Sequence, residues 1–321
     1  AFYVQDVDNV MIEGNEVNTL AGACVFARDV SGIRVTNNRW QNNNWYMVNF
    51  ASDVKHFNIS NNEFISETTD GAVIRLQSVV NVLVQNNKIS GIDNTASGAE
   101  ITGIVVTTRG TSSSNKNSPS ENVRIIGNYL EGPSNISNTT GRQRAIVVNN
   151  LWWPARQPSN NIEVSGNIIN SASGTLFWDE GIGFHGYDGG FKNVIVENNF
   201  VKVEMNTSVA IGGAIGFIAS TADGLIDGVL IGGNYLEEIA APVASYQNGI
   251  QIGAYTDNVI NSKPNTIDNF FYGVRTFTNS GPTLVSLDDQ NFQTNTTDTV
   301  FGVDLSTYGS FLLASSDAAD P

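Results

Sequence analysis

The residues with the clearest chemical potential lie within 178–190, a segment that holds three carboxylates and one of the two histidines of the chain. Asp179 and Glu180 stand at one end of a short apolar stretch, Asp188 stands at the other, and His185 lies between them. Cleavage of a glycosidic bond needs one carboxyl group to protonate the leaving oxygen and a second to activate water or attack the sugar. We therefore predict these four residues as candidate catalytic groups.

Other side chains of the chain suit the binding of a sugar. Aromatic rings with a polar edge pack against sugar faces, and long polar side chains hold hydroxyl or carboxylate groups. The candidate binding residues are Trp152, Trp153, Trp178, Tyr187, Arg75, Arg109, Asn149 and Glu100.

Each candidate also has a structural interpretation. His185 can be a surface residue, and the acidic residues can be ordinary turn residues, for which Asp and Gly are frequent choices. Trp152 and Trp153 can pack a loop onto the body of the protein. No compact ligand motif for a metal is present, and the sequence predicts no cofactor.

A repeated unit positions these residues. Its template is an apolar residue, any residue, an apolar residue, two further residues, Asn, any residue and an apolar residue, and 194–201 is a clear copy. Apolar residues two apart indicate a strand with one buried face, and a repeat of this length indicates a solenoid. The Asn residues of the eight clear copies are Asn15, Asn38, Asn62, Asn87, Asn128, Asn167, Asn199 and Asn234.

The spacing of the repeats defines the kind of solenoid. The first copies follow one another at intervals of 23 to 25 residues, which suits a coil of three short strands at about 3.3 Å per residue. Fainter copies end at Asn269 and Gln290. We expect the repeated Asn to turn the chain in the left-handed conformation and to form an amide ladder along the stack. The prediction is an all-β, right-handed, single-stranded parallel β-helix over 1–280, followed by a terminal coil, a small β cap and a flexible tail over 281–321.

A second repeated strand predicts where a binding groove lies. The segments 71–75, 103–107, 145–149, 181–185 and 249–253 align without gaps. Alternation along a strand then places four side chains in one outward column: Arg75, Thr107, Asn149 and His185. Long insertions on consecutive coils, at 91–121, 132–144, 151–161, 171–180 and 202–213, should line one flank of this sheet. Loops on a rigid scaffold often carry function, so this face is the predicted groove.

Composition excludes several classes of partner. The chain has 321 residues, a net charge of −15 and only 15% charged residues, so binding to nucleic acid through charge is excluded. No apolar run approaches the ~20 residues that span a membrane.

Cys24 is the only cysteine, which rules out an internal disulfide. No helix precedes the first coil, so we expect upstream sequence or a partner to cover its open edge.

The coil pattern of about 7–280 resembles the right-handed β-helix superfamily of pectate lyases, and more closely the polysaccharide-degrading tailspikes of bacteriophages. The resemblance implies an elongated glycan ligand, an extracellular or virion location and a homotrimer. It also implies acidic pairs on or between the helices, which Asp179, Glu180 and Asp188 match. The motifs of polygalacturonases and the Lys/Arg arrangement of pectate lyases are absent, which disfavours those two activities.

We expect a protein that binds a polysaccharide and hydrolyses it with paired carboxylates near residue 180. A polysaccharide lyase remains an alternative, with His185 or Tyr187 as base and Arg75 or Arg109 neutralising an acidic sugar. A receptor-binding fibre or adhesin that uses the same groove without catalysis is the other alternative.

Overall fold

The protein is described from a computed structural model of the whole chain. The described residues are 2–20, 23–43, 46–52, 54–66, 71–92, 101–108, 119–134, 143–150, 157–172, 178–186, 189–205, 213–219, 222–241, 247–253, 255–277, 285–287 and 290–301.

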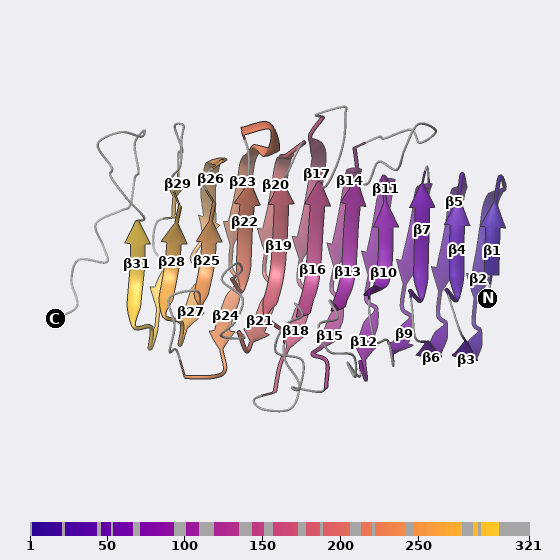
Figure 1. Cartoon of the computed structure of the whole chain (residues 1–321), viewed down its shortest axis with the longest axis horizontal. Helices are drawn as coiled ribbons and strands as arrows, with labels where there is room; N and C mark the ends of the chain where they lie inside the picture. The colour runs from indigo at the N-terminus through magenta and orange to yellow at the C-terminus, as the bar shows by residue number, and fades with distance from the viewer. Residues whose placement is uncertain are drawn as a thin grey trace.

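The described residues form three long sheets in which every paired strand is parallel, and the chain visits the sheets in rotation (Figure 1). Sheet A has eleven strands: β1 (Phe2–Gln5), β4 (Val25–Arg28), β7 (Val48–Ser52), β10 (Gly71–Gln77), β13 (Ile101–Thr108), β16 (Gln143–Asn150), β19 (Glu180–Gly186), β22 (Ile215–Ala219), β25 (Asn248–Ile252), β28 (Tyr272–Thr276) and β31 (Thr297–Phe301). Sheet B has ten: β2 (Asp8–Glu13), β5 (Ser31–Thr36), β8 (Lys55–Ser60), β11 (Val80–Gln85), β14 (Glu121–Ile126), β17 (Ser159–Ser165), β20 (Phe191–Glu197), β23 (Ile226–Gly232), β26 (Thr256–Lys263) and β29 (Val285–Ser286).

Sheet C also has ten strands: β3 (Glu16–Leu20), β6 (Arg39–Asn43), β9 (Glu63–Ile65), β12 (Lys88–Ser90), β15 (Tyr129–Glu131), β18 (Ile168–Asn170), β21 (Phe200–Val203), β24 (Tyr235–Glu238), β27 (Thr266–Asp268) and β30 (Asn291–Phe292). One short 3-10 helix, η1 (Ala222–Gly224), lies between β22 and β23. Each coil thus contributes one strand to each sheet, which confirms the predicted right-handed parallel β-helix.

The predicted amide ladder runs through the turn between sheets B and C. Asn128 is typical: its Oδ1 accepts from the backbone N and the Nδ2 of Asn87, and its own Nδ2 donates to Oδ1 of Asn167, all at 3.0 Å. The ladder continues beyond Asn234 through Asn265 to Gln290. Asn265 therefore takes the place that we predicted for Asn269, whose amide instead donates to two carbonyl groups elsewhere.

The left-handed conformation falls one residue earlier than predicted. Asn37, Asn61, Asn86 and Asn198 have φ between 53° and 57°, and Gly takes the same place in several other coils. Each of these residues precedes a ladder Asn. The ladder Asn itself keeps a negative φ, and its amide joins neighbouring coils. Two successive residues therefore form the turn and the ladder, whereas we predicted that one Asn would do both.

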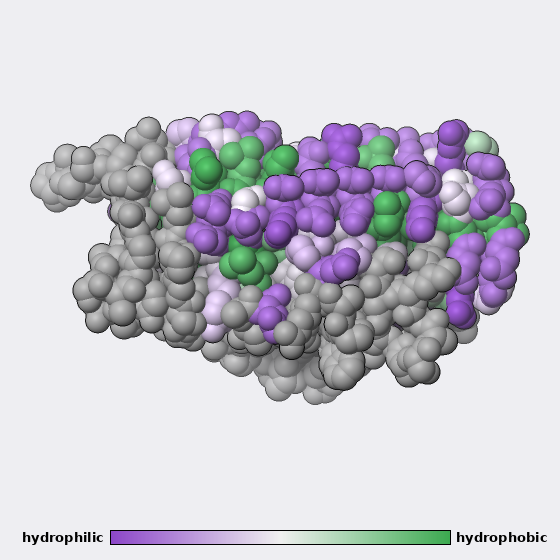
Figure 2. Space-filling view, turned by 90° about the horizontal axis from the view of Figure 1, so that it is seen from above, coloured by the Kyte–Doolittle hydropathy of each residue, from purple (hydrophilic) through white to green (hydrophobic). Residues whose placement is uncertain are grey.

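A second, exposed ladder of amides crosses the start of sheet B. Asn122 donates to Asn81 at 2.9 Å, Asn161 donates to Asn122 at 3.0 Å, and Asn193 donates to Asn161 at 3.2 Å. Hydrophilic residues on the described surface form rows along the long axis, interrupted by hydrophobic clusters (Figure 2).

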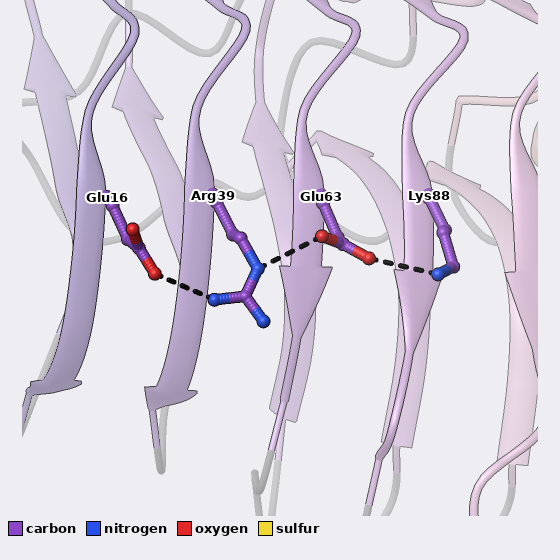
Figure 3. A network of polar contacts seen from close by, with 4 residues as sticks. All are labelled: Glu16, Arg39, Glu63 and Lys88. Atoms are coloured by element: carbon purple, nitrogen blue, oxygen red, sulfur yellow. Dashed lines mark hydrogen bonds and ion pairs between the residues drawn. The ribbon is translucent and has the colours of Figure 1, made fainter.

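A ladder of salt bridges joins the first four coils on sheet C. Glu16, Arg39, Glu63 and Lys88 alternate in sign across β3, β6, β9 and β12, with contacts of 2.8 to 3.1 Å (Figure 3). The hydrogen bond from Lys88 is the largest influence that lowers the pKa of Glu63. Exposed ion pairs contribute little to the stability of a fold. These four residues link one strand to the next, and their arrangement suggests no chemistry.

The core fills the space between the three sheets and is almost entirely aliphatic and aromatic. At one position in strands of sheet A, two successive residues are both buried, such as Ala145 and Ile146 in β16, or Ala214 and Ile215 at the start of β22. We call this position the corner of sheet A. Gly181 occupies this corner in β19, because a Cβ on it would lie 2.4 Å from Cγ1 of Val201. The corner shifts the inward–outward alternation by one residue.

The sheets continue past residue 280 through β29, β30 and β31. The predicted cap and tail after 301, and most residues of the predicted insertions, lie outside the described residues. Within the described part of the chain, no helix has the length and apolar character needed to cross a membrane.

Candidate functional site

The outer face of sheet A brings several predicted residues together around β16 and β19. The strand register pairs Asn149 with His185, Val147 with Gly183 and Arg144 with Glu180. It also pairs Arg75 with Val105 and Gln77 with Thr107. The predicted outward column is therefore right for Thr107, Asn149 and His185 and wrong for Arg75, which lies two residues away along the neighbouring strands.

Glu180 and His185 form the centre of the site. Nε2 of His185 lies 2.9 Å from Oε1 of Glu180, and the two side chains are only 2% and 3% exposed. They meet above Gly183, where an added Cβ would lie 2.5 Å from the glutamate oxygen and 2.8 Å from the histidine nitrogen. The absence of a side chain at residue 183 is thus what allows the pair to form.

A second glycine lies beside Gly183 in the next coil. Gly216 pairs with Gly183, and a Cβ on it would lie 3.3 Å from Oε1 of Glu180. The tripeptide Ile-Gly-Phe occurs at both 182–184 and 215–217, a signal that our alignment missed. The carboxyl group of Glu180 thus lies over two adjacent glycines, which together leave the room that it occupies.

The other glycines of 178–190 have packing roles. Gly186 and Gly190 approach the backbone of residues 224 and 225 so closely that an added Cβ would lie 2.1 and 1.9 Å from a carbonyl oxygen. Gly190 also has φ of 56°. Among the described glycines of this segment, only Gly183 borders the acid–base pair.

Asn149 and Asp179 flank the pair with different roles. Asn149 is 9% exposed, and its buried Oδ1 has no hydrogen-bond partner among the described residues. This oxygen can accept a hydrogen bond from a ligand hydroxyl group, because buried polar atoms are normally paired. Asp179 instead accepts the backbone N–H of Gln143 at 2.9 Å and donates its own N–H to the Gln143 carbonyl at 2.7 Å. Asp179 thus joins two coils as well as standing beside the site.

Trp178 departs from its predicted role. Its side chain is 0% exposed and belongs to the hydrophobic core, so it presents no ring face to a sugar. Arg75 lies over the ring of Tyr46 at 5.0 Å. The remaining candidates, which are Asp188, Trp152, Trp153, Tyr187, Arg109 and Glu100, lie outside the described residues.

A buried carboxyl group that we did not predict lies at the end of sheet C. Glu238 is 0% exposed, and its two oxygens accept the backbone N–H groups of Met205 and Ala240, each at 3.1 Å. Its pKa is raised to about 8: burial is the largest cause, the two backbone hydrogen bonds oppose it, and the nearby charges of Glu204 and Asp179 act in the same direction as burial. Side chains two residues apart on a strand point to the same face. The position of Glu238 two residues after the core residue Leu236 is therefore the sequence signal that its side chain points inward.

We expect Glu238 to make stability depend on pH. Its pKa is about 8 in the folded protein against 4.5 for the free side chain, so the folded state binds the proton more tightly. Its contribution is complete below about pH 4.5 and is lost as the pH rises through about 8. The free energy of unfolding should therefore fall by a few kcal/mol between about pH 5 and pH 9.

Denaturant unfolding of wild type and Glu238→Gln across this range measures the effect. The variant should lose most of the pH slope, whereas Glu237→Gln, which removes the partly exposed partner of Lys202, should keep it. Parallel profiles for wild type and Glu238→Gln would show that Glu238 is ionised in the fold at neutral pH.

No group of three or more His, Cys, Asp or Glu side chains in the described part of the chain is arranged to hold a metal ion. The described site offers acid–base chemistry through Glu180 and His185, with hydrogen bonding from Asn149.

Comparison with known proteins gives structural likeness at low sequence identity. No family model matches the chain, and no curated protein matches it. A crystal structure of PfbA, a surface adhesin of Streptococcus pneumoniae, is 13% identical, with a TM-score of 0.45, over 93% of this chain and 81% of that one. The tailspike protein of E. coli bacteriophage HK620, in complex with a pentasaccharide, is 13% identical, with a TM-score of 0.38, over 96% of this chain and 60% of that one.

The A-module of the mannuronan C-5 epimerase AlgE6 of Azotobacter vinelandii is 12% identical, with a TM-score of 0.30, over 92% of this chain and 91% of that one. At TM-scores below 0.5 these likenesses say nothing about the activity of this chain. What its own three parallel sheets establish is that the protein is a right-handed parallel β-helix.

Proposed function

We propose that this protein binds a polysaccharide along the outer face of sheet A and cleaves its glycosidic bonds by acid–base chemistry at Glu180 and His185. The observation that carries the proposal is the buried contact of 2.9 Å between these two side chains above Gly183. A buried carboxyl group and imidazole are costly to keep without a role.

The pair has the geometry of a base held by an orienting group. When Nε2 carries the proton, His185 donates to the Glu180 carboxylate, which fixes the ring and stabilises the imidazolium that forms when the other nitrogen takes a proton. In hydrolysis, this base activates a water molecule for attack on the sugar. A second carboxyl group must then protonate the leaving oxygen, and Asp188 stays our predicted candidate for that role.

The same hydrogen bond favours a second candidate reaction, β-elimination. A histidine held by a carboxylate can remove the proton at C5 of a uronic acid. The electron pair of that C–H bond forms the C4–C5 double bond, the C4–O bond breaks, and the leaving oxygen takes a proton from a general acid. This lyase reaction requires a uronic acid in the substrate, whereas hydrolysis does not.

Product analysis separates these reactions. The protein is incubated with a panel of bacterial and plant polysaccharides, and new reducing ends and ultraviolet absorption by unsaturated sugars are both followed. Hydrolysis predicts reducing ends without absorption, and elimination predicts both. Binding of a polysaccharide with neither product would overturn the cleavage proposal and leave the receptor-binding fibre or adhesin as the function.

A glycan-degrading surface of this kind acts on extended polymers outside cells, so we place the protein in the extracellular space or on a virion surface. The homotrimer implied by the family resemblance stays a prediction.

A further inference from the structure

We infer that Gly216 is a positioning residue, which keeps the carboxyl group of Glu180 in hydrogen-bonding contact with His185 because it carries no side chain. This inference rests on the proposed acid–base role of that pair. It adds to the proposed function a residue of the neighbouring coil that acts on the reaction only through Glu180.

Two adjacent glycines interrupt one row of side chains on sheet A. The strand register orders the members of this row as Arg75, Val105, Val147, Gly183, Gly216, Gln251 and Arg275. Glycine in the middle of a strand weakens the strand, and it often marks a place where another group approaches the backbone closely. The group that approaches both of these glycines is the carboxyl group of Glu180.

The surroundings of Gly216 show which group needs the absence of a Cβ there. An added Cβ would lie 3.3 Å from Oε1 of Glu180. The next nearest atoms, N of Gly213 and Cδ1 of Ile218, would both be 3.8 Å away, which is an ordinary van der Waals distance. Residue 216 also lacks the positive φ that favours glycine. Its backbone therefore accepts alanine, and the methyl group would disturb the carboxyl group of Glu180.

Other glycines of sheet A are needed for packing of the backbone. A Cβ at Gly181 would lie 2.5 Å from the carbonyl oxygen of Ala214, and a Cβ at Gly249 would lie 2.5 Å from the carbonyl oxygen of Gly273. Alanine at either residue would push two strands apart. At residue 216 the one close contact is with a side chain, so the effect of alanine should be confined to the site.

A methyl group at residue 216 would alter the contact on which the proposed chemistry depends. At 3.3 Å from Oε1 of Glu180, it would displace that oxygen by a few tenths of an ångström. This oxygen lies 2.9 Å from Nε2 of His185, and both side chains are buried, so a hydrogen bond near its best length would be distorted. A misplacement of about 1 Å can cost about a hundredfold in rate, and we expect about a tenfold loss for this smaller one.

The first readout reports the position of Glu180 without any substrate. The chain has only two histidines, His56 and His185, so protein labelled with nitrogen-15 in histidine gives NMR ring signals from two side chains, and His185→Asn assigns them. Glu180→Gln shows how the His185 signals change when the carboxylate is lost. Gly216→Ala should also shift the His185 signals, and it should leave the His56 signals unchanged.

The second readout is cleavage of the polysaccharide. Gly216→Ala should lower the turnover rate about tenfold and leave KM unchanged, because binding of the polymer does not depend on the displaced oxygen. Thermal unfolding should show no loss of stability, because alanine suits the backbone at this residue.

The control is Gly166→Ala, in the turn between sheets B and C, where φ is 63° and an added Cβ would lie 3.9 Å from the nearest atom. This variant should lower stability because alanine is strained at that φ. It should leave the His185 signals and the cleavage rate unchanged.

Each other outcome overturns a defined part of the account. If Gly216→Ala leaves the His185 signals unshifted, the inference is overturned whether or not cleavage slows, and the proposed function stands. Equal losses of cleavage in Gly216→Ala and Gly166→Ala would attribute them to stability and would also overturn it. Shifted His185 signals with unchanged cleavage would show that Gly216 positions Glu180 and would overturn the proposed catalytic role of the pair. If the wild-type protein cleaves no polysaccharide, the proposed function fails, and the His185 signals still decide whether Gly216 positions Glu180.

Discussion

Replacing Glu180 by Gln should reduce polysaccharide cleavage by at least about a hundredfold, because an oriented acid–base group contributes factors of that size or more. The amide keeps the volume of the carboxyl group above Gly183. It removes the negative charge that orients and stabilises the protonated imidazole of His185. Binding of the polymer should persist, so the loss should appear in the turnover rate, which the release of reducing ends measures.

A double-variant experiment distinguishes a working pair from two separate structural residues. His185→Asn should cost about as much activity as Glu180→Gln, and the double variant should cost little more than the more damaging single variant, since residues that act as a unit are not additive. Glu163→Gln, which removes an acidic group on sheet B that pairs with Arg124, should leave cleavage unchanged. Additive losses in the double variant would contradict the pair.

Replacing Asn128 by Ala should lower the free energy of unfolding by about 3 to 5 kcal/mol, the largest stability effect that we predict. The Asn128 side chain is 1% exposed. Its amide bonds both neighbouring coils, through Asn87 and Asn167, and also donates to the backbone carbonyl of Val84 at 3.0 Å. Alanine leaves these buried groups unpaired, and each unpaired group costs about 1 to 3 kcal/mol.

Denaturant unfolding measures this loss, and the exposed ladder supplies the control. Asn122→Gly removes an exposed amide and suits the backbone, since residue 122 has φ of 53°. Its cost should stay below about 1 kcal/mol. Equal costs for the two variants would show that the inner ladder contributes no more to stability than the surface ladder does.

The fold could be predicted from the sequence because one chemical requirement repeats in every coil. The ladder Asn needs an Asn above and below it, and the apolar residues two apart must face one core, so periodicity alone specifies three parallel sheets. The place of Asn265 was missed because the last coils depart from the template around it. The left-handed residue was assigned one position late, because Asn suits both the turn and the ladder.

The site was predicted less completely because its geometry depends on the corner of sheet A. Glu180 and His185 are five residues apart, and a regular strand would point them to opposite faces. The corner at Gly181 and Ile182 shifts the alternation, which brings both side chains to the outer face. The predicted register of Arg75 was wrong for a related reason. Gly71 and Gly103 were aligned as equivalents, whereas the register pairs Gly71 with Ile101.

The remaining differences between prediction and structure arise from contacts between residues that are distant in the sequence. Trp178 directly precedes the site residues, and nothing in its neighbours' types shows that its ring enters the core. Glu238 gains its raised pKa from burial and from residues of other coils, which no local pattern displays. The sequence therefore identifies Glu180 and His185 as candidates, and the folded chain is needed to show that they form one group.

The most direct test of the account is a crystal structure of Glu180→Gln with a fragment of the polysaccharide that the wild-type protein binds. We predict that the glycan lies on the outer face of sheet A, parallel to the axis, with one ring within hydrogen-bonding distance of residues 180 and 185. A glycan bound to sheet B or sheet C, with no sugar in contact with residue 180 or His185, would contradict it.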